Sequence, residues 1–347
     1  MDVKHNPNSF KSTWRRAHTD QWTLYHWFYE ILDIHQVFDD RPVPVHQKHE
    51  KVPYLPNRQL NAWVITFGCI PLAIHQAFTM ITGYNLPFFI AYFYYGFCLT
   101  AIAIHQLRLM RKLGHIHGFL DGDKHARDGV PDNAVKKTFL SLLSTVVFRP
   151  LLMMVLTYKS NKAPASINLA WLPVEICLYP IATDFWFYWY HRLMHEVGFL
   201  WKFHRTHHLT KHPNALLTIF ADTEQEIFDI AIIPLLSCGA LRGLGLPMGF
   251  YEFWLCHQFV IFTEILGHTG LRVHLYAASP ISWLLRALNL ELALEDHDLH
   301  HRSGWKNSHN YGKQTRVWDR LFGTCGKRIE CQDDNIDFIN TASMPFF

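Results

Sequence analysis

Histidines are the residues of this sequence best placed to do chemistry, because they recur in three clusters. Residues 184–212 read DFWFYWYHRLMHEVGFLWKFHRTHHLTKH and hold the first two clusters, and the third lies in EDHDLHHR at 295–302. Within each cluster the spacing of three or four residues places side chains on one face of a helix. Imidazole is the commonest metal ligand. We therefore expect each cluster to aim its imidazoles at one point; the clusters are His191 and His195, then His204, His207 and His208, then His297, His300 and His301.

Long apolar runs must position these clusters. Each is close to the roughly 20 residues that span a bilayer as a helix. The third run is interrupted by Arg149-Pro150, so a re-entrant path is an alternative there. The sequence predicts an all-α, multi-span membrane bundle with a cytosolic, histidine-rich helical cap. The runs are 62–82, 87–107, 138–158, 167–190, 227–246 and 248–267.

The order of these runs predicts that all three clusters lie on one side of the membrane. The first two clusters follow the fourth run, and the fifth and sixth runs cross and return before the third cluster. The loop 108–137 carries seven Lys or Arg, which is typical of the cytosolic side. We therefore expect the clusters and both termini to be cytosolic.

The number of histidines favours two metals. His268 directly follows the last apolar run and brings the set on that side of the membrane to nine. A single metal rarely needs more than three or four protein ligands. The clusters contain no cysteine, which argues against structural zinc. Neutral nitrogen ligands suit iron, copper or zinc, and the sequence leaves that choice open.

Composition limits which partners and which cellular compartment we expect for this protein. The chain has 347 residues and a formal net charge of only +3, and no basic and aromatic residues interleave along a groove, so nucleic acid is not an expected partner. The seven cysteines form no CxxC pair, which indicates buried, reduced thiols. The first sixteen residues contain no apolar core of a cleavable signal peptide. A short helix is expected at about 20–37, before a proline-rich stretch.

Taken in order, the segments DFWFYWYHRLMH, HRTHH, HTG at 268–270, HDLHH, NYG and WDRLFGT resemble the fatty acid hydroxylase/sterol desaturase superfamily. The resemblance covers roughly residues 170–325. It implies a membrane-embedded non-haem diiron enzyme of the endoplasmic reticulum that hydroxylates sterol, sphingoid, fatty acyl or terpenoid-like lipids. It also implies that the nine histidines are metal ligands, with His274 as a weaker additional candidate.

The resemblance further implies the cofactors and partners. These are two iron ions, dioxygen as co-substrate, and electrons from NAD(P)H through a cytochrome b5-type protein and its reductase. The sequence has no HPGG haem-binding segment, so the donor is expected to be a separate protein. The open alternatives are a C-5 sterol-type desaturase, a sterol methyl oxidase and, from another class, a histidine-rich metal transporter.

Four carboxylates are candidates to accept the second ring N–H of the ligand imidazoles, as carboxylates commonly do: Asp184, Glu264, Asp296 and Asp298. The sequence departs from the superfamily pattern at Glu196 and at the segment ADTEQE, 221–226, which alters either the surroundings of the ligands or the substrate entrance. We expect a cytosolic arm at 1–60, a membrane region at 61–165, the hydroxylase-like domain at 166–325 and a tail at 326–347.

Overall fold

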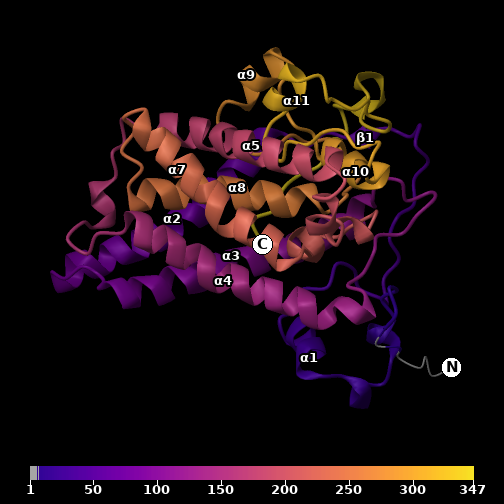
Figure 1. The fold of residues 1–347 in the computed structure, drawn as a ribbon, viewed down its shortest axis with the longest axis horizontal. Helices are drawn as coiled ribbons and strands as arrows, with labels where there is room; N and C mark the ends of the chain where they lie inside the picture. The colour runs from indigo at the N-terminus through magenta and orange to yellow at the C-terminus, as the bar shows by residue number, and fades with distance from the viewer. Residues whose placement is uncertain (1–5, 7) are drawn as a thin grey trace.

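Helices dominate the computed structural model, which describes residue 6 and residues 8–347. Six long helical segments lie roughly parallel to one another, and α10, which carries the third histidine cluster, lies near one end of the bundle (Figure 1). This confirms the predicted all-α class. The long helices are α2 (Asn57–Thr82), α3 (Phe88–His117), α4 (Val135–Thr157), α5 (Leu172–Glu196), α7 (Ile233–Gly243) and α8 (Phe250–Gly267).

The first three predicted spans are helices long and apolar enough to cross a membrane: Asn57–Thr82, Phe88–His117 and Asp132–Thr157. The last of these joins the short 3₁₀ turn η3 (Asp132–Ala134) to α4. Helix α4 continues without a break through Arg149-Pro150. Arg149 is buried there, and its Nη1 lies 3.5 Å from Oε2 of Glu264 on α8, which keeps the charge paired inside the bundle.

The other three predicted spans are helical, and their crossing of a membrane remains a prediction. Helix α5 packs against α7 and α8, and most side chains of α8 are buried inside the protein. Helix α7 is preceded without a break by α6 (Thr223–Ile227) and a π-helical turn, η8 (Phe228–Ile232). Eleven residues rise about 17 Å, so α7 approaches the thickness of a bilayer only together with these two segments.

The N-terminal arm packs on the end of the bundle that carries the histidines. Its helix α1 (Leu24–Ile31) is shorter than the predicted 20–37, and two 3₁₀ turns precede it, η1 (Trp14–Arg16) and η2 (Thr19–Gln21). Farther on, β1 (Val52–Pro53) pairs in parallel with β2 (Ile336–Asp337). The arm and the C-terminal tail are therefore tied together beside the site.

The histidine clusters lie on two kinds of backbone, α-helix and irregular chain. The first is on the last turns of α5, and the third is on α10 (Leu294–Ser303). The second lies on irregular chain with two 3₁₀ turns, η5 (Trp201–Phe203) and η6 (His207–Leu209), and not on the α-helix that its spacing predicts. The short helices α9 (Ser282–Ala287) and α11 (Val317–Leu321) flank α10 in sequence. Three further 3₁₀ turns complete the described elements: η4 (Pro164–Ser166), η7 (Ala215–Ile219) and η9 (Asp333–Asn335).

Candidate metal centre

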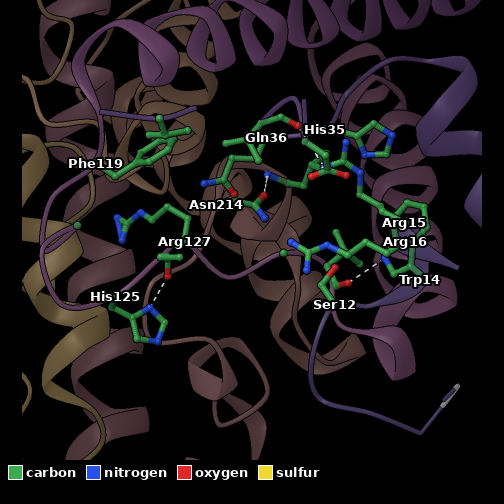
Figure 2. Close-up of a pocket in the computed structure, with 18 of the residues that line it drawn as sticks. Ser12, Trp14, Arg15, Arg16, His35, Gln36, Phe119, His125, Arg127 and Asn214 are labelled. Carbon is green, nitrogen blue, oxygen red and sulfur yellow. Dashed lines mark hydrogen bonds and ion pairs between the residues drawn. The ribbon is translucent and has the colours of Figure 1, made fainter. Parts of the chain in front are cut away.

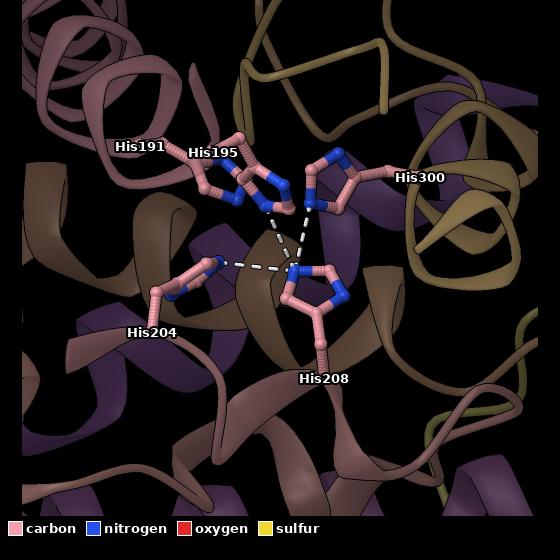
Figure 3. A group of neighbouring side chains, drawn as sticks. All are labelled: His191, His195, His204, His208 and His300. Carbon is pink, nitrogen blue, oxygen red and sulfur yellow. Dashed lines mark hydrogen bonds between the residues drawn. The ribbon is translucent and has the colours of Figure 1, made fainter. Parts of the chain in front are cut away.

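All nine histidines come together in two buried groups. In each group, one ring nitrogen from every member lies within 4.8 Å of those of the others. Figure 3 shows the larger group, in which side chains from three separate segments point at one another. We call them the five-histidine group (His191, His195, His204, His208 and His300) and the four-histidine group (His207, His268, His297 and His301).

The expectation that each cluster aims at a single point holds for His191 and His195, which share one group, and is wrong for the other two clusters, which are divided between the groups. On α10, successive residues are rotated by 100° about the helix axis. His297 and His301 are four apart, differ by about 40°, and share the four-histidine group. His300 is turned about 100° from His301 and joins the other group. In the second cluster, the 3₁₀ backbone likewise separates His207 from His204 and His208.

The neighbours of the rings fix the tautomer of six of these imidazoles. In each case Nδ1 faces an oxygen that can only accept a hydrogen bond, so Nδ1 carries the proton and Nε2 keeps its lone pair. The pairs are His191 with Tyr311 O (2.7 Å), His195 with Trp305 O (3.0 Å), His300 with His309 O (2.8 Å), His268 with Glu264 O (2.8 Å), His207 with Phe220 O (3.2 Å) and His204 with Gln225 Oε1 (2.9 Å).

The Nε2 atoms then face one another at short range. That of His208 lies 3.0 Å from His204 and 3.1 Å from both His195 and His300 (Figure 3). A single proton on His208 can satisfy one of these three contacts, and the remaining lone pairs repel. Two nitrogens bound to one metal at about 2.1 Å and at right angles are about 3.0 Å apart. The spacing is therefore the one that a shared cation requires.

The four-histidine group repeats this arrangement. His268 Nε2 lies 3.3 Å from His207 Nε2 and 3.1 Å from His297 Nε2. Nε2 of His191 and both ring nitrogens of His301 are buried without a hydrogen-bond partner among the described residues. Buried nitrogens that lack a partner are costly unless a ligand takes them up. Both donor sets therefore fit a metal ion.

Burial keeps these imidazoles neutral and ready to bind a metal. It lowers the pKa of His195 to about 4 and that of His268 to about 3, and it holds the pKa of the other seven well below the ordinary value. The positive charge of Lys313 acts in the same direction on several of them. At neutral pH no proton has to be displaced before a cation enters.

Of the four predicted residues, Asp184, Asp296 and Asp298 bind other groups, so the prediction is wrong for them; Glu264 does accept a hydrogen bond from His268, but through its backbone carbonyl and not its carboxylate. Asp184 accepts hydrogen bonds from the backbone N–H groups of Lys313 (2.7 Å) and Gln314 (3.0 Å), so it shapes the loop that follows Tyr311. Each of the others is occupied by an arginine. Asp296 binds Arg328, Asp298 binds Arg127 and Arg302, and the Glu264 side chain faces Arg149, while its backbone carbonyl accepts from His268.

The groups that do hold the rings are mostly backbone carbonyls, which sequence reasoning missed. Every residue carries a carbonyl, so its type gives no signal. Two signals were nevertheless present. The NYG segment contains Tyr311, and the segment ADTEQE contains Gln225, the one side chain among the six acceptors.

His274 lies outside both groups, so the structure does not bring this additional candidate to the site. Its Nε2 lies 2.9 Å from the hydroxyl of Tyr276. His212 and His257 also lie elsewhere, against Asp121 and Tyr179. His309 contributes its carbonyl oxygen to His300 and does not contribute its ring to either group.

An apolar groove of about 490 Å³ lies beside the segment that supports His204. It runs between α4 and residues 223–231, the stretch that also carries Gln225. Its walls are mainly aliphatic and aromatic, with a polar edge at Ser144, Thr223 and Glu226; the apolar members are Phe148, Leu151, Leu152, Val155, Ile227, Ile230 and Ala231.

Apolar helices that can cross a membrane and two buried histidine groups that can hold metal define a membrane-associated, histidine-rich metalloprotein. Comparison with known proteins identifies it further. The fatty acid hydroxylase family model matches residues 176–324. The fatty acid hydroxylase vlmA of Lecanicillium sp is 41% identical over 308 residues, which cover 85% of this chain and 84% of that protein. The chain therefore belongs to the fatty acid hydroxylase family, as its resemblance predicts.

More distant relatives share the histidine-bearing part. Human alkylglycerol monooxygenase is 30% identical over 151 residues, or 42% of this chain and 29% of that enzyme. The very-long-chain aldehyde decarbonylase GL1-11 of Oryza sativa subsp. indica is 28% identical over 150 residues, 43% of this chain and 52% of that protein. No solved structure matches. These relatives mark the chain as an oxidoreductase of the monooxygenase type that acts on lipids.

Proposed function

We propose that this protein is a membrane-bound diiron oxygenase that hydroxylates an unactivated C–H bond of a fatty acyl lipid with dioxygen. The observation that carries the proposal is the meeting of nine buried imidazoles in two adjacent groups, with their Nε2 lone pairs facing inward. The 41% identity to a protein named as a fatty acid hydroxylase supports the substrate class.

In this proposal each histidine group holds one iron. A pair of irons, when bound, supplies the activation of dioxygen that attack on an unactivated C–H bond needs. The chain's own residues prepare the site. The carbonyls of Tyr311, Trp305 and His309 keep three of the rings in one tautomer and orientation. Burial of all nine rings excludes water from the metals.

The groove between α4 and residues 223–231 is the proposed binding site of the acyl chain. Its apolar lining matches a hydrocarbon, and its volume is within the range of sites for molecules of that size. We further propose that electrons come from NAD(P)H through a cytochrome b5-type protein and its reductase. The proposed location is the endoplasmic reticulum membrane, with the histidines on the cytosolic side.

The test is product analysis in membranes from cells that express the native chain, His207→Ala or His49→Ala. His207 belongs to the four-histidine group, whereas His49 is exposed and outside both groups, so it controls for loss of a histidine. Fatty acyl lipids are supplied with ¹⁸O₂. We expect the native chain and the His49 variant to form a lipid that carries one labelled oxygen, and the His207 variant to form none at equal protein content.

Three outcomes overturn the proposal. A product that lacks two hydrogens and carries no labelled oxygen identifies a desaturase. Metal uptake into sealed vesicles without oxygen consumption identifies a transporter. Full activity of the His207 variant removes the metal role assigned to the four-histidine group. Iron analysis of the purified native chain should give about two irons per chain, one for each histidine group.

A further inference from the structure

A second cavity, of about 310 Å³, lies outside the two histidine groups. Its walls come from four stretches of chain, which lie within residues 12–16, 35–45, 119–130 and 214–216. Figure 2 shows Arg15 and Arg16 on one side of it, Arg127 and His125 on the opposite side, and Gln36 between them. None of these residues has a part in the proposed metal centre.

The lining of this cavity is basic. Its charged residues are Arg15, Arg16, Arg127 and Asp39. Asp39 Oδ1 lies 3.3 Å from Nη1 of Arg15, so the one acid is already paired. Arg16 is exposed at the rim and makes no ion pair with any described residue. The balance of charge favours an anionic occupant.

Two buried donors in this cavity have no acceptor among the residues that the structure describes. The Arg127 side chain is only 2% exposed; its Nη2 pairs with Asp298 and its Nε lies 3.4 Å from Thr269 O, which leaves Nη1 without a partner. Nε2 of Gln36 is likewise buried and has no hydrogen-bond partner in the described part of the chain. An unmet buried donor is costly, most of all on a charged group. Acceptor oxygens of a bound ligand would satisfy both donors.

A much smaller space adjoins the cavity on the side of the metal centre. This space, of about 10 Å³, shares His35, Gln36, Phe119, Asn214 and Leu216 with the larger cavity. Its other walls are Ile34, Leu107, Met110, Ala215, Arg111 and Thr269, the residue after His268. A space of that size holds about one water molecule, so any apolar part of a ligand lies in the larger cavity, whose walls include Val37, Val43 and Val130. Arginines beside an apolar wall suit a molecule with an anionic head and an apolar tail.

We propose that this cavity binds the oxyanion head group, carboxylate or phosphate, of an amphiphile. Arg127, Gln36 and Arg16 donate to its oxygens, and the first part of the tail lies against the apolar wall of the same cavity. The proposal rests on the proposed function in one respect, because it assigns an anionic head group to the lipid substrate. Arginine suits this role because its planar fork matches both oxyanions and stays charged.

The test measures binding directly, without iron or reductant. The purified full chain in a neutral detergent is dialysed against radiolabelled dodecanoate, dodecyl phosphate or dodecanol, and dodecanol reports partition into the detergent. We expect saturable binding of the two anions and none of the alcohol. Arg127→Met removes the central donor but also frees Asp298. The double variant Arg16→Gln with Gln36→Leu is therefore the main probe. Among the described residues Arg16 has no ion-pair partner and Nε2 of Gln36 has no acceptor, so the double variant leaves no carboxylate unpaired.

The double variant should bind dodecanoate at least about tenfold more weakly, because hydrogen bonds to a charged group are lost. Arg41→Gln is the matched control: it removes one exposed arginine of the same arm, outside the cavity, and should leave binding unchanged. Displacement of dodecanoate by millimolar inorganic phosphate identifies the free oxyanion as a sufficient ligand. Failure of phosphate, with dodecanoate still bound, identifies the whole amphiphile. Either result supports the site.

Equal binding of dodecanol, or unchanged binding by the double variant, overturns the inference. Those results leave the oxygenase proposal intact as long as labelled product still forms. Conversely, saturable anion binding by a chain that forms no product would reject the oxygenase and keep the site. The two proposals therefore fail separately.

Discussion

Gln225 should control how tightly the five-histidine group holds its metal. It is fully buried, and its Oε1 lies 2.9 Å from Nδ1 of His204. Its Nε2 lies 3.3 Å from Oδ2 of Asp229, which orients the amide with the oxygen toward the imidazole. Gln225→Leu keeps the approximate size of the side chain and removes the acceptor. His204 then keeps a buried Nδ1–H without a partner, or turns away from the metal.

The size of the effect follows from that lost bond. An unsatisfied buried donor costs about 1–3 kcal/mol, and loss of the hydrogen-bond partner of a metal-bound histidine typically lowers metal affinity about 10–100-fold. The two figures agree, since each factor of ten is about 1.4 kcal/mol. We therefore expect the Gln225→Leu chain to bind iron about 10–100-fold more weakly.

The assay is competition for iron between the purified chain and a chelator of known affinity, read as protein-bound iron. Gln106→Leu is the matched control, because Gln106 is also a buried glutamine, and its Nε2 donates to Phe262 O (2.8 Å) inside the helix bundle. That variant should lose some stability and keep its iron affinity. The reasoning is refuted if Gln225→Leu binds iron within twofold of the native chain, or if Gln106→Leu weakens it equally.

Three further predictions concern other parts of the molecule. Asp121 is buried, which raises its pKa, but its bonds with Lys48 and His212 and the charge of Arg302 outweigh burial and lower the pKa to about 2. Asp121 therefore adds about 2 kcal/mol to the free energy of unfolding, fully above pH 4, and this stabilisation is lost as the pH falls toward 2. Asp121→Asn should remove this acid dependence of stability, measured by denaturant unfolding at each pH. His274→Gln should retain the native iron content by elemental analysis, because His274 lies outside both histidine groups; loss of half the iron would make it a ligand. Removal of iron by a chelator should lower the melting temperature of the native chain, and iron should restore it, because a ligand that binds the folded state stabilises it; an unchanged melting temperature would contradict metal binding at these histidines.

Local sequence patterns were enough to predict the long helices and to predict which nine histidines come together. An apolar run of 20 residues forms a helix in a membrane because its backbone must satisfy its own hydrogen bonds there, and the first three runs appear as α2, α3 and α4. The second histidine cluster was predicted less well. Its spacing suits a helix, but the chain between α5 and α6 forms 3₁₀ turns instead.

Only the tertiary structure decided how the histidines divide between the two groups. His300 and His301 are neighbours in sequence, yet they belong to different groups because a helix turns by 100° per residue. The hydrogen-bond acceptor of His191 is the backbone carbonyl of Tyr311, 120 residues away. Every residue has a carbonyl, so the sequence cannot show which one will accept this bond. The basic cavity likewise depends on stretches of the arm and of the loop 119–130 that meet only in the folded chain. Sequence therefore set which side chains are available, and packing between distant segments set what each of them faces.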